Sequence, residues 1–555
     1  MELRRPRSSA APTLALAGAL ALGSAVGLSC SVTNGQGGPP AASSAPEPQA
    51  APPSVRLYLM SNVAGAIEPC GCSKDQLGGA DHFAALVASE RANVKDAIIL
   101  GAGPLFFQDP TLKGDEGAQA RWKADALAQA AKRLGVAAWA PGANDFAGGV
   151  DELTRLSQAS GITLLGANLK SSAPISSSKI VDAGGVKIGI LGVSEPKAGP
   201  SAPSGVEIEP AAVALKREVA SLRAGGARVI VALAAIQRGD ALRLIDEVPD
   251  VDVMLVGKPS EKGDLNDQPK PATIVGETVI VETSNHLQTV AVLDLFVREP
   301  AGSTGRIRLA DGGGIAKAEQ TVSLARQIRD LETRINGWEK DKAVNKNDLA
   351  ARRSELERLR KEKADLEAKS EPPPSGSYFK YALVEIRDKL GVDPGVGEDI
   401  LSYYRRVNDH NKVALKDRKP PPVPEGEAGY IGLEQCTTCH AEERAVWDKT
   451  DHAKAYPTLE QKFVEFNLDC VSCHVTGYDR PGGSSVTHVQ DLKNVQCETC
   501  HGPGSLHAKE PEKKGLIAIK PEPKSCVTEC HHPPHVENFD PVAKMELILG
   551  PGHGK

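Results

Sequence analysis

The sequence predicts a multidomain protein with an α/β domain, a segment of long helices that can form a coiled-coil hairpin, and a small, mainly α C-terminal domain. A chain of 555 residues suggests about three to four folding units. Short apolar segments alternate with amphipathic ones between residues 55 and 297, which is typical of α/β domains. Eight of the 11 cysteines and ten of the 13 histidines lie after residue 435. The net charge of -6 provides no basic surface of the kind nucleic-acid binders use, so we exclude nucleic acid as a partner.

Residues 1–29 have the order of a secretory signal peptide. Three arginines precede an apolar run from Leu14 to Leu28, which is shorter than a membrane span. The run ends just before Cys30 in a stretch that resembles a bacterial lipoprotein box, although Leu28 lies one place closer to the cysteine than is usual. This resemblance implies lipidation of Cys30, with ordinary signal cleavage as the alternative. Residues 30–54 are rich in Gly, Pro, Ala and Ser and form an expected flexible linker. We therefore expect a periplasmic protein with a membrane anchor.

Residues 55–300 form the expected α/β domain. Its apolar segments predict strands at Val55–Met60, Ala97–Leu100, Lys187–Val193, Arg228–Leu233 and Val251–Val256.

Residues 316–370 predict two helices. Charge is high, and apolar residues follow heptad positions in two series: Leu324, Ile328, Leu331, Ile335 and Trp338, then Leu349, Leu356, Leu359 and Leu366. The series is interrupted near residues 345–348, which favours a helical hairpin over one rod. The hairpin is either a solvated spacer or a coiled-coil surface for self-association. Residues 371–429 predict a further helical region and a Pro-rich linker.

The C-terminal domain, residues 430–555, contains four cysteine pairs that are each followed by a histidine. The sets are Cys436, Cys439 and His440; Cys470, Cys473 and His474; Cys497, Cys500 and His501; and Cys526, Cys530 and His531. Three are C-x-x-C-H, the attachment signal of c-type haem: two thiols one helical turn apart form thioethers with the vinyl groups, and the imidazole binds the iron. The fourth is C-x-x-x-C-H, one residue longer. Zinc sites or disulfides would not require a histidine after every pair. We predict four haem c groups, with the four histidines as proximal iron ligands.

Six further histidines are candidates for the sixth position on the irons. They are His452, His488, His507, His532, His535 and His553. Haems with two imidazoles have low potentials and transfer electrons, whereas an iron without a sixth protein ligand can bind a small molecule. For His488 and His532, an exposed loop position is an equally good interpretation.

The C-terminal domain resembles the tetrahaem cytochrome c-554 family. The stretches that carry the resemblance are Tyr430–His440, Asp451–Tyr456, Cys470–Gly477 and Val495–Gly504 followed by His507. The resemblance implies a periplasmic electron carrier with mostly bis-histidine haems in near contact, and redox proteins as partners. It also implies His452, His507, His535 and His553 as distal ligands, without indicating which haem each serves. A domain of this size builds its core around porphyrins, so we expect the haem-free protein not to fold.

The α/β domain resembles the metallophosphatase domain of the 5′-nucleotidase family. Matching stretches are Leu57–Gly65, Gly78–Gly79, Ile99–Pro104, Pro141–Phe146, Gly185–Gly192 and Asp252–Gly257. The resemblance implies a two-sheet αββα sandwich. The family's metal ligands are replaced by Asn62, Ala64, Pro104, Ala143, Asn144, Ala235 and Lys258–Ser260. Because two-metal hydrolysis needs those ligands, we expect no phosphatase activity.

Cys70 and Cys72 lie in the loop that follows the first expected strand, where reactive groups of α/β folds gather. The pair could be a disulfide of no functional importance, a soft-metal site or a redox-active dithiol. The leading hypothesis for the whole chain is an exported multihaem cytochrome that transfers electrons, with an α/β domain that docks a partner or contributes the thiols. The alternative is a multihaem oxidoreductase that acts on a small inorganic or thiol substrate. An active phosphatase is the least supported interpretation.

Overall fold

The computed structural model describes residues 51–69, 76–112, 114–197, 202–261, 266–300, 302–340, 344–368, 372–532, 536 and 539–550. Expectations for Cys30, Cys70, Cys72, His535 and His553, and for the signal peptide, fall outside these residues. Residues 52–555 form one compact unit. No helix in the described ranges has both the length and the apolar character needed to cross a membrane.

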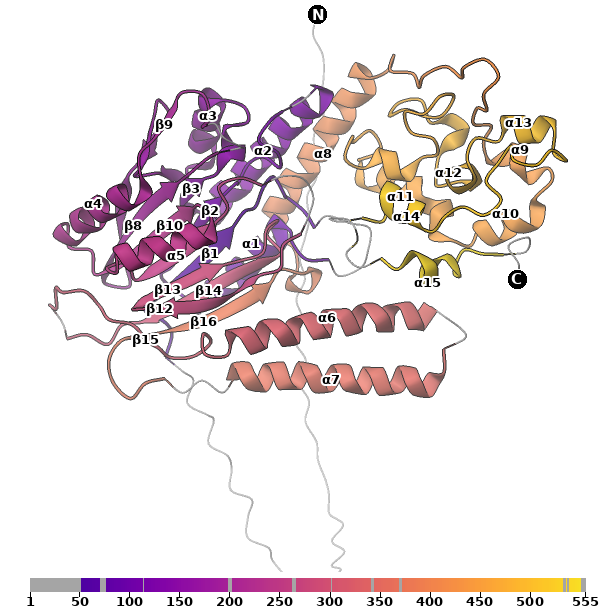
Figure 1. The fold of residues 1–555 in the computed structure, drawn as a ribbon. Helices are drawn as coiled ribbons and strands as arrows, with labels where there is room; N and C mark the ends of the chain where they lie inside the picture. The colour runs from indigo at the N-terminus through magenta and orange to yellow at the C-terminus, as the bar shows by residue number, and fades with distance from the viewer. Residues whose placement is uncertain are drawn as a thin grey trace, which may run out of the picture. The chain divides into compact units, whose positions relative to one another are not determined.

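The α/β part contains two large sheets (Figure 1). All five strands expected from the sequence are present, as β1, β2, β8, β10 and β11. The first sheet has eight strands in the order β15 (Ala310–Asp311), β16 (Tyr378–Glu385), β14 (Thr289–Phe296), β1 (Val55–Ser61), β2 (Ala97–Gly103), β3 (Val136–Pro141), β4 (Thr163–Leu165) and β6 (Ile175–Ser176). The second has six, in the order β12 (Lys270–Val275), β13 (Thr278–Glu282), β11 (Val253–Gly257), β10 (Val229–Ala235), β8 (Val186–Ser194) and β7 (Ser178–Ala183). A two-stranded sheet pairs β5 (Leu169–Ser171) with β9 (Val206–Ile208).

Alternation along the strands explains why the two sheets face each other. On β1, Leu57 and Leu59 enter the core between the sheets, whereas Tyr58 and Met60 enter a second core under helices. That outer layer consists of α1 (Ala80–Glu90), α2 (Gly114–Leu134), α3 (Val150–Ser160) and α8 (Pro394–Ala414). On the far face of the second sheet, α4 (Ala211–Ala224) and α5 (Arg238–Glu247) cover a third core. The expected αββα sandwich is therefore confirmed.

Three elements beyond residue 300 complete the α/β part. β16 pairs with β14 along its whole length, β15 pairs with β16, and α8 packs against α1 and α2. Residues 55–300 are thus only the first section of this sandwich.

The two long helices α6 (Ala318–Lys340) and α7 (Lys346–Ala368) lie side by side between β15 and β16 in the sequence (Figure 1). The heptad residues Leu324, Ile328, Leu331 and Ile335 bury against Leu356 and Leu359. Ion pairs Arg353–Glu339 (2.6 Å) and Arg360–Glu332 (2.8 Å) show that the two helices are antiparallel.

In its described residues, the C-terminal part forms short helices, which agrees with the expected small, mainly α domain. They are α9 (Leu433–Thr437), α10 (Ala441–Trp447), α11 (Ala455–Lys462), α12 (Cys497–His501), α13 (Ser505–Lys509), α14 (Lys524–Glu529) and α15 (Pro541–Met545). Short 3-10 turns include η3 (Asp451–Lys454) and η4 (Val471–His474). The buried apolar cluster of this part is small: Leu415, Tyr456, Leu459, Val464, Val471, Val475, Val486 and Val489.

Candidate haem-binding site

Each cysteine pair of the C-terminal part lies in or beside a single helical turn. Cys436 is in α9, Cys470 precedes η4, Cys497 opens α12, and Cys526 is in α14. One turn brings the two sulfurs of a pair to the same side of the backbone, with the histidine directly after them. This placement suits the attachment of both sulfurs of a pair to one porphyrin.

The proximal histidines are oriented through their Nδ1 atoms. Nδ1 lies 2.6 Å from the Ala455 carbonyl in His474 and 2.6 Å from the Ala518 carbonyl in His501. Because a carbonyl only accepts, each Nδ1 carries the proton and Nε2 holds the lone pair that binds a metal. In His440, Nδ1 faces the Glu443 carboxylate at 3.8 Å. Burial also lowers the pKa of His474, which favours the neutral, ligating imidazole.

Two of the expected distal histidines face proximal histidines. The ring centroids of His440 and His507 are 6.4 Å apart, and those of His452 and His531 are 6.1 Å apart. Two imidazoles on opposite sides of one metal, with bonds of about 2 Å and ring centres about 1 Å beyond each nitrogen, have centroids about 6 Å apart. Burial lowers the pKa of both His452 and His531, which favours their neutral, ligating form. The spacing of the two pairs fits a bis-histidine haem.

His488, another candidate, has different surroundings. Its Nδ1 lies near the hydroxyl oxygens of Thr487 (3.1 Å) and Ser485 (3.4 Å) in a local turn. The His531 ring, which faces His452, also stacks on Phe539 with centroids 4.1 Å apart.

Thiols from different motifs meet in two places. The Cys436 thiol donates to Cys497, which raises the pKa of Cys436 and lowers that of Cys497 to about 7. The Cys530 thiol donates to Cys473 in the same way and lowers the pKa of Cys473 to about 6. The first motif therefore lies beside the third, and the second beside the fourth.

Glu498, between the two thiols of the third motif, was not singled out from the sequence. Its carboxylate is 2% exposed and accepts backbone N–H groups from Ile431 (3.0 Å), Gly432 (2.8 Å) and Gly504 (2.7 Å). Glu498 thereby joins residues 431–432, at the start of the C-terminal domain, to the third motif. The only sequence signal is a charged residue enclosed within an attachment motif.

The replaced metal-ligand positions of the α/β part hold amides and an ammonium group. The Asn144 amide donates to the carbonyls of Phe107 (3.1 Å) and Gln108 (2.7 Å) and accepts from the backbone N–H of Glu261 (3.0 Å). Asn62 Oδ1 accepts the backbone N–H of Lys258 at 2.7 Å.

The Lys258 side chain completes this arrangement. Its ammonium group pairs with Glu261 (2.9 Å) and with Asp267. In the described part of the chain, no group of three or more His, Cys, Asp or Glu side chains is suitable for a metal ion.

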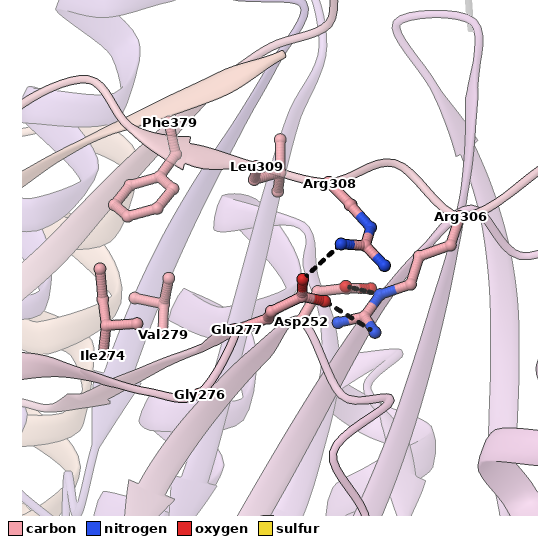
Figure 2. Close-up of a pocket in the computed structure, with 9 residues that line it drawn as sticks. All are labelled: Asp252, Ile274, Gly276, Glu277, Val279, Arg306, Arg308, Leu309 and Phe379. Atoms are coloured by element: carbon pink, nitrogen blue, oxygen red, sulfur yellow. Dashed lines mark hydrogen bonds and ion pairs between the residues drawn. The ribbon is translucent and has the colours of Figure 1, made fainter. Parts of the chain in front are cut away.

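A cavity of about 150 Å³ lies elsewhere on the α/β part (Figure 2). Arg306 pairs there with Asp252 (2.7 Å) and Glu277 (3.3 Å), and Arg308 pairs with Glu277 (2.9 Å). Asp252 directly precedes β11, so the cavity lies at the amino-terminal edge of the strands, opposite the edge where α/β proteins bind ligands. Its charges pair with one another, and we interpret it as structural.

Comparison with known proteins gives two separate likenesses. Residues 435–502 match the family described as cytochrome c554 and c-prime. Over 105 residues the chain is 31% identical to cytochrome c-554 of Nitrosomonas europaea, an alignment that covers 16% of this chain and 45% of that protein. The chain thus spans less than half the length of the curated relative it matches. The match confirms the resemblance of the C-terminal part and implies covalently bound haem c.

The second likeness is to solved structures. The 5′-nucleotidase precursor of Thermus thermophilus is 16% identical with a TM-score of 0.42, covering 69% of this chain and 62% of that chain. The sulfate thiohydrolase SoxB of Thermus thermophilus is 16% identical with a TM-score of 0.38, covering 44% and 54%.

Proposed function

We propose that this chain is an electron-transfer protein with one haem c at each of its four C-terminal motifs. The observation that carries the proposal is the set of paired imidazoles beside thiol pairs, His440 with His507 at 6.4 Å and His452 with His531 at 6.1 Å. When bound, haem supplies an iron that cycles between the ferric and ferrous states.

The two facing pairs support an assignment of iron ligands for the first and fourth haems. His440 and His507 would hold the first iron, and His531 and His452 the fourth. This assigns His452 and His507 to particular haems, which the sequence left open. His535 and His553 remain the candidates implied by the family for the second and third irons.

The chain's own residues prepare the site for electron transfer. The Ala455 and Ala518 carbonyls hold the Nδ1 protons of His474 and His501, so these rings present Nε2 without a change of tautomer. Two protein ligands on an iron leave no open position, so such a haem transfers electrons without binding substrate. The contacts Cys436–Cys497 and Cys473–Cys530 support two pairs of neighbouring haems.

The rest of the proposal concerns the other parts of the chain. The signal-like first 29 residues and Cys30 support export to the periplasm and a lipid anchor. The amide and ammonium groups at the former metal positions support a scaffold that no longer hydrolyses phosphate esters and instead docks redox partner proteins. Cys70 and Cys72 would add a thiol redox centre to this scaffold.

The axial assignment is tested by His507→Ala and His452→Ala in haem-loaded protein. Each variant should convert one low-spin haem to high-spin in the oxidised electronic and EPR spectra, because one iron loses its sixth ligand. His488→Ala is the matched control, since that ring lies in a local hydroxyl turn, and its spectrum should match that of the parent. Unchanged spin states in both test variants would contradict the assignment.

A further inference from the structure

Helices α2 and α8 of the α/β part bond to the haem domain at a short segment, residues 466–470, which we call the junction segment. Both backbone groups of Phe466 form hydrogen bonds to side chains of α8. Its N–H donates to Asn408 (3.0 Å), and its carbonyl accepts from Asn411 (2.9 Å). On α2, the Gln119 amide donates to Asn467 (2.7 Å) and accepts the N–H of Leu468 (3.1 Å).

This contact is a buried amide network rather than a surface contact. Gln119, Asn467 and Asn411 are each 2–3% exposed, and satisfied buried polar networks rigidify the elements they join. The Asn467 carbonyl also accepts the backbone N–H groups of Cys470 (3.1 Å) and Val471 (3.0 Å). Asn467 therefore bonds to α2 and also stabilises the turn that carries Cys470, the first thiol of the second haem motif.

Tyr404 on α8 lies beside this turn. Its side chain packs against the core of the α/β part and also against the cluster that includes Cys470 and Phe466. Its hydroxyl donates to the Glu68 carboxylate, which follows β1. Burial, followed by the neighbouring Glu68 carboxylate, raises the pKa of Tyr404, so the hydroxyl keeps its proton and remains a donor.

We propose that the haem attached at Cys470 and Cys473 is the one coupled to the α/β part, and that Glu68, positioned by Tyr404, sets its reduction potential. The inference rests on the proposed function, because it requires a haem at the second motif. Glu68 and Tyr404 are positioning residues: neither touches the iron.

The sign of the effect follows from charge. Ferric haem carries one more positive charge than ferrous haem, so a nearby carboxylate stabilises the ferric form and lowers the potential. Glu68 is half-buried, and burial raises the pKa of its carboxyl group, so the effect is measured at pH 8, where the ionised carboxylate is screened less than one in water. Lys123, Lys462 and Asp81 also act on this carboxylate. They are unchanged in a Glu68→Gln variant, so the difference between parent and variant isolates Glu68.

The test is a redox titration of the haem-loaded full chain at pH 8, monitored by EPR so that the haems are resolved. Glu68→Gln keeps an oxygen that accepts from Tyr404 and should move one component to higher potential while the others stay. Tyr404→Phe removes only the hydroxyl and should displace the same component.

Glu90→Gln is the matched control. Glu90 also accepts from a tyrosine, Tyr58 (2.5 Å), and it pairs with Arg56 (2.6 Å), but both of these partners belong to β1. All components should keep their potentials in this variant. Thermal unfolding of each holoprotein shows whether a shift accompanies a loss of fold. A reduction potential that shifts only in variants whose holoprotein unfolds at a lower temperature than the parent counts against the proposal.

The outcomes separate the two claims. A parental chain without haem at the second motif would overturn the proposed function. A loaded chain in which neither Glu68→Gln nor Tyr404→Phe displaces a component, or in which Glu90→Gln displaces the same one, would overturn the coupling alone.

Discussion

Glu498 offers the sharpest test of how the haem domain is held together. One carboxylate oxygen accepts from Ile431 (3.0 Å) and Gly504 (2.7 Å), and the other from Gly432 (2.8 Å) and, more weakly, Ile431 (3.1 Å). Replacement by alanine removes the acceptor of three backbone N–H groups. Replacement by glutamine keeps the volume but leaves one accepting oxygen. An N–H group at Gly432 or Gly504 then faces the amide NH2 group, which can only donate.

The magnitude follows from the number of donors left without a partner. Each buried unsatisfied N–H group costs about 1–3 kcal/mol. We therefore expect Glu498→Gln to lower the free energy of unfolding by about 2 kcal/mol and Glu498→Ala by about 3 kcal/mol or more. Since a typical domain is stable by about 5–15 kcal/mol, the alanine variant loses a substantial fraction of the domain's stability.

The assay is denaturant unfolding of the haem-loaded protein, followed in the Soret band, which reports on the haem domain. Glu434→Gln is the control, because that side chain is 79% exposed and pairs with Arg444 at 3.0 Å. Its effect should stay within about 0.5 kcal/mol. If Glu498→Ala unfolds within about 1 kcal/mol of the control, the carboxylate does not hold the domain together.

Three further outcomes are expected. Burial lowers the pKa of His286 from 6.5 to about 4, so the unfolded chain binds a proton that the folded chain does not; stability should fall by up to about 3 kcal/mol as the pH decreases through this window, and His286→Gln should flatten the dependence measured by unfolding of the α/β part. Phosphate-ester hydrolysis should stay at the blank level with added manganese, zinc or magnesium, and turnover abolished by a chelator would contradict this. A haem assay should return four haems per chain. Three haems would indicate that the longer motif at Cys526 and Cys530 carries none, and two or fewer would contradict the assignment of the domain.

Local patterns predicted the elements whose signals lie within one stretch of sequence. The apolar run at β1 identified that strand, and the C-x-x-C-H spacing indicated which thiols and histidines are expected to hold haem. β16 was missed because it pairs with β14 across the inserted helices α6 and α7, and no local signal reveals such a distant partner. For the same reason, candidates for the distal ligands could be named from the sequence but not paired: only the folded chain brings His507 to His440.

The loops at the carboxyl edge of the first sheet show how the α/β part is held where the family's metal ligands are replaced. Asn62 and Ala64 after β1, and His286 and Leu287 before β14, all have positive φ angles between 47° and 56°, which cost free energy for residues other than glycine. Such strain persists only where surrounding contacts fix it. Here the His286 N–H donates to the Asn62 carbonyl (2.9 Å), and the Asn62 side chain accepts from Lys258 (2.7 Å).

In this chain, these hydrogen bonds and the ion pairs of Lys258 with Glu261 and Asp267 supply that restraint. The same loop geometry also places Glu68, six residues after Asn62, within reach of Tyr404 on α8. Under the coupling proposed above, this restrained loop fixes the Glu68 carboxylate on Tyr404, which also packs against the cluster that includes Cys470.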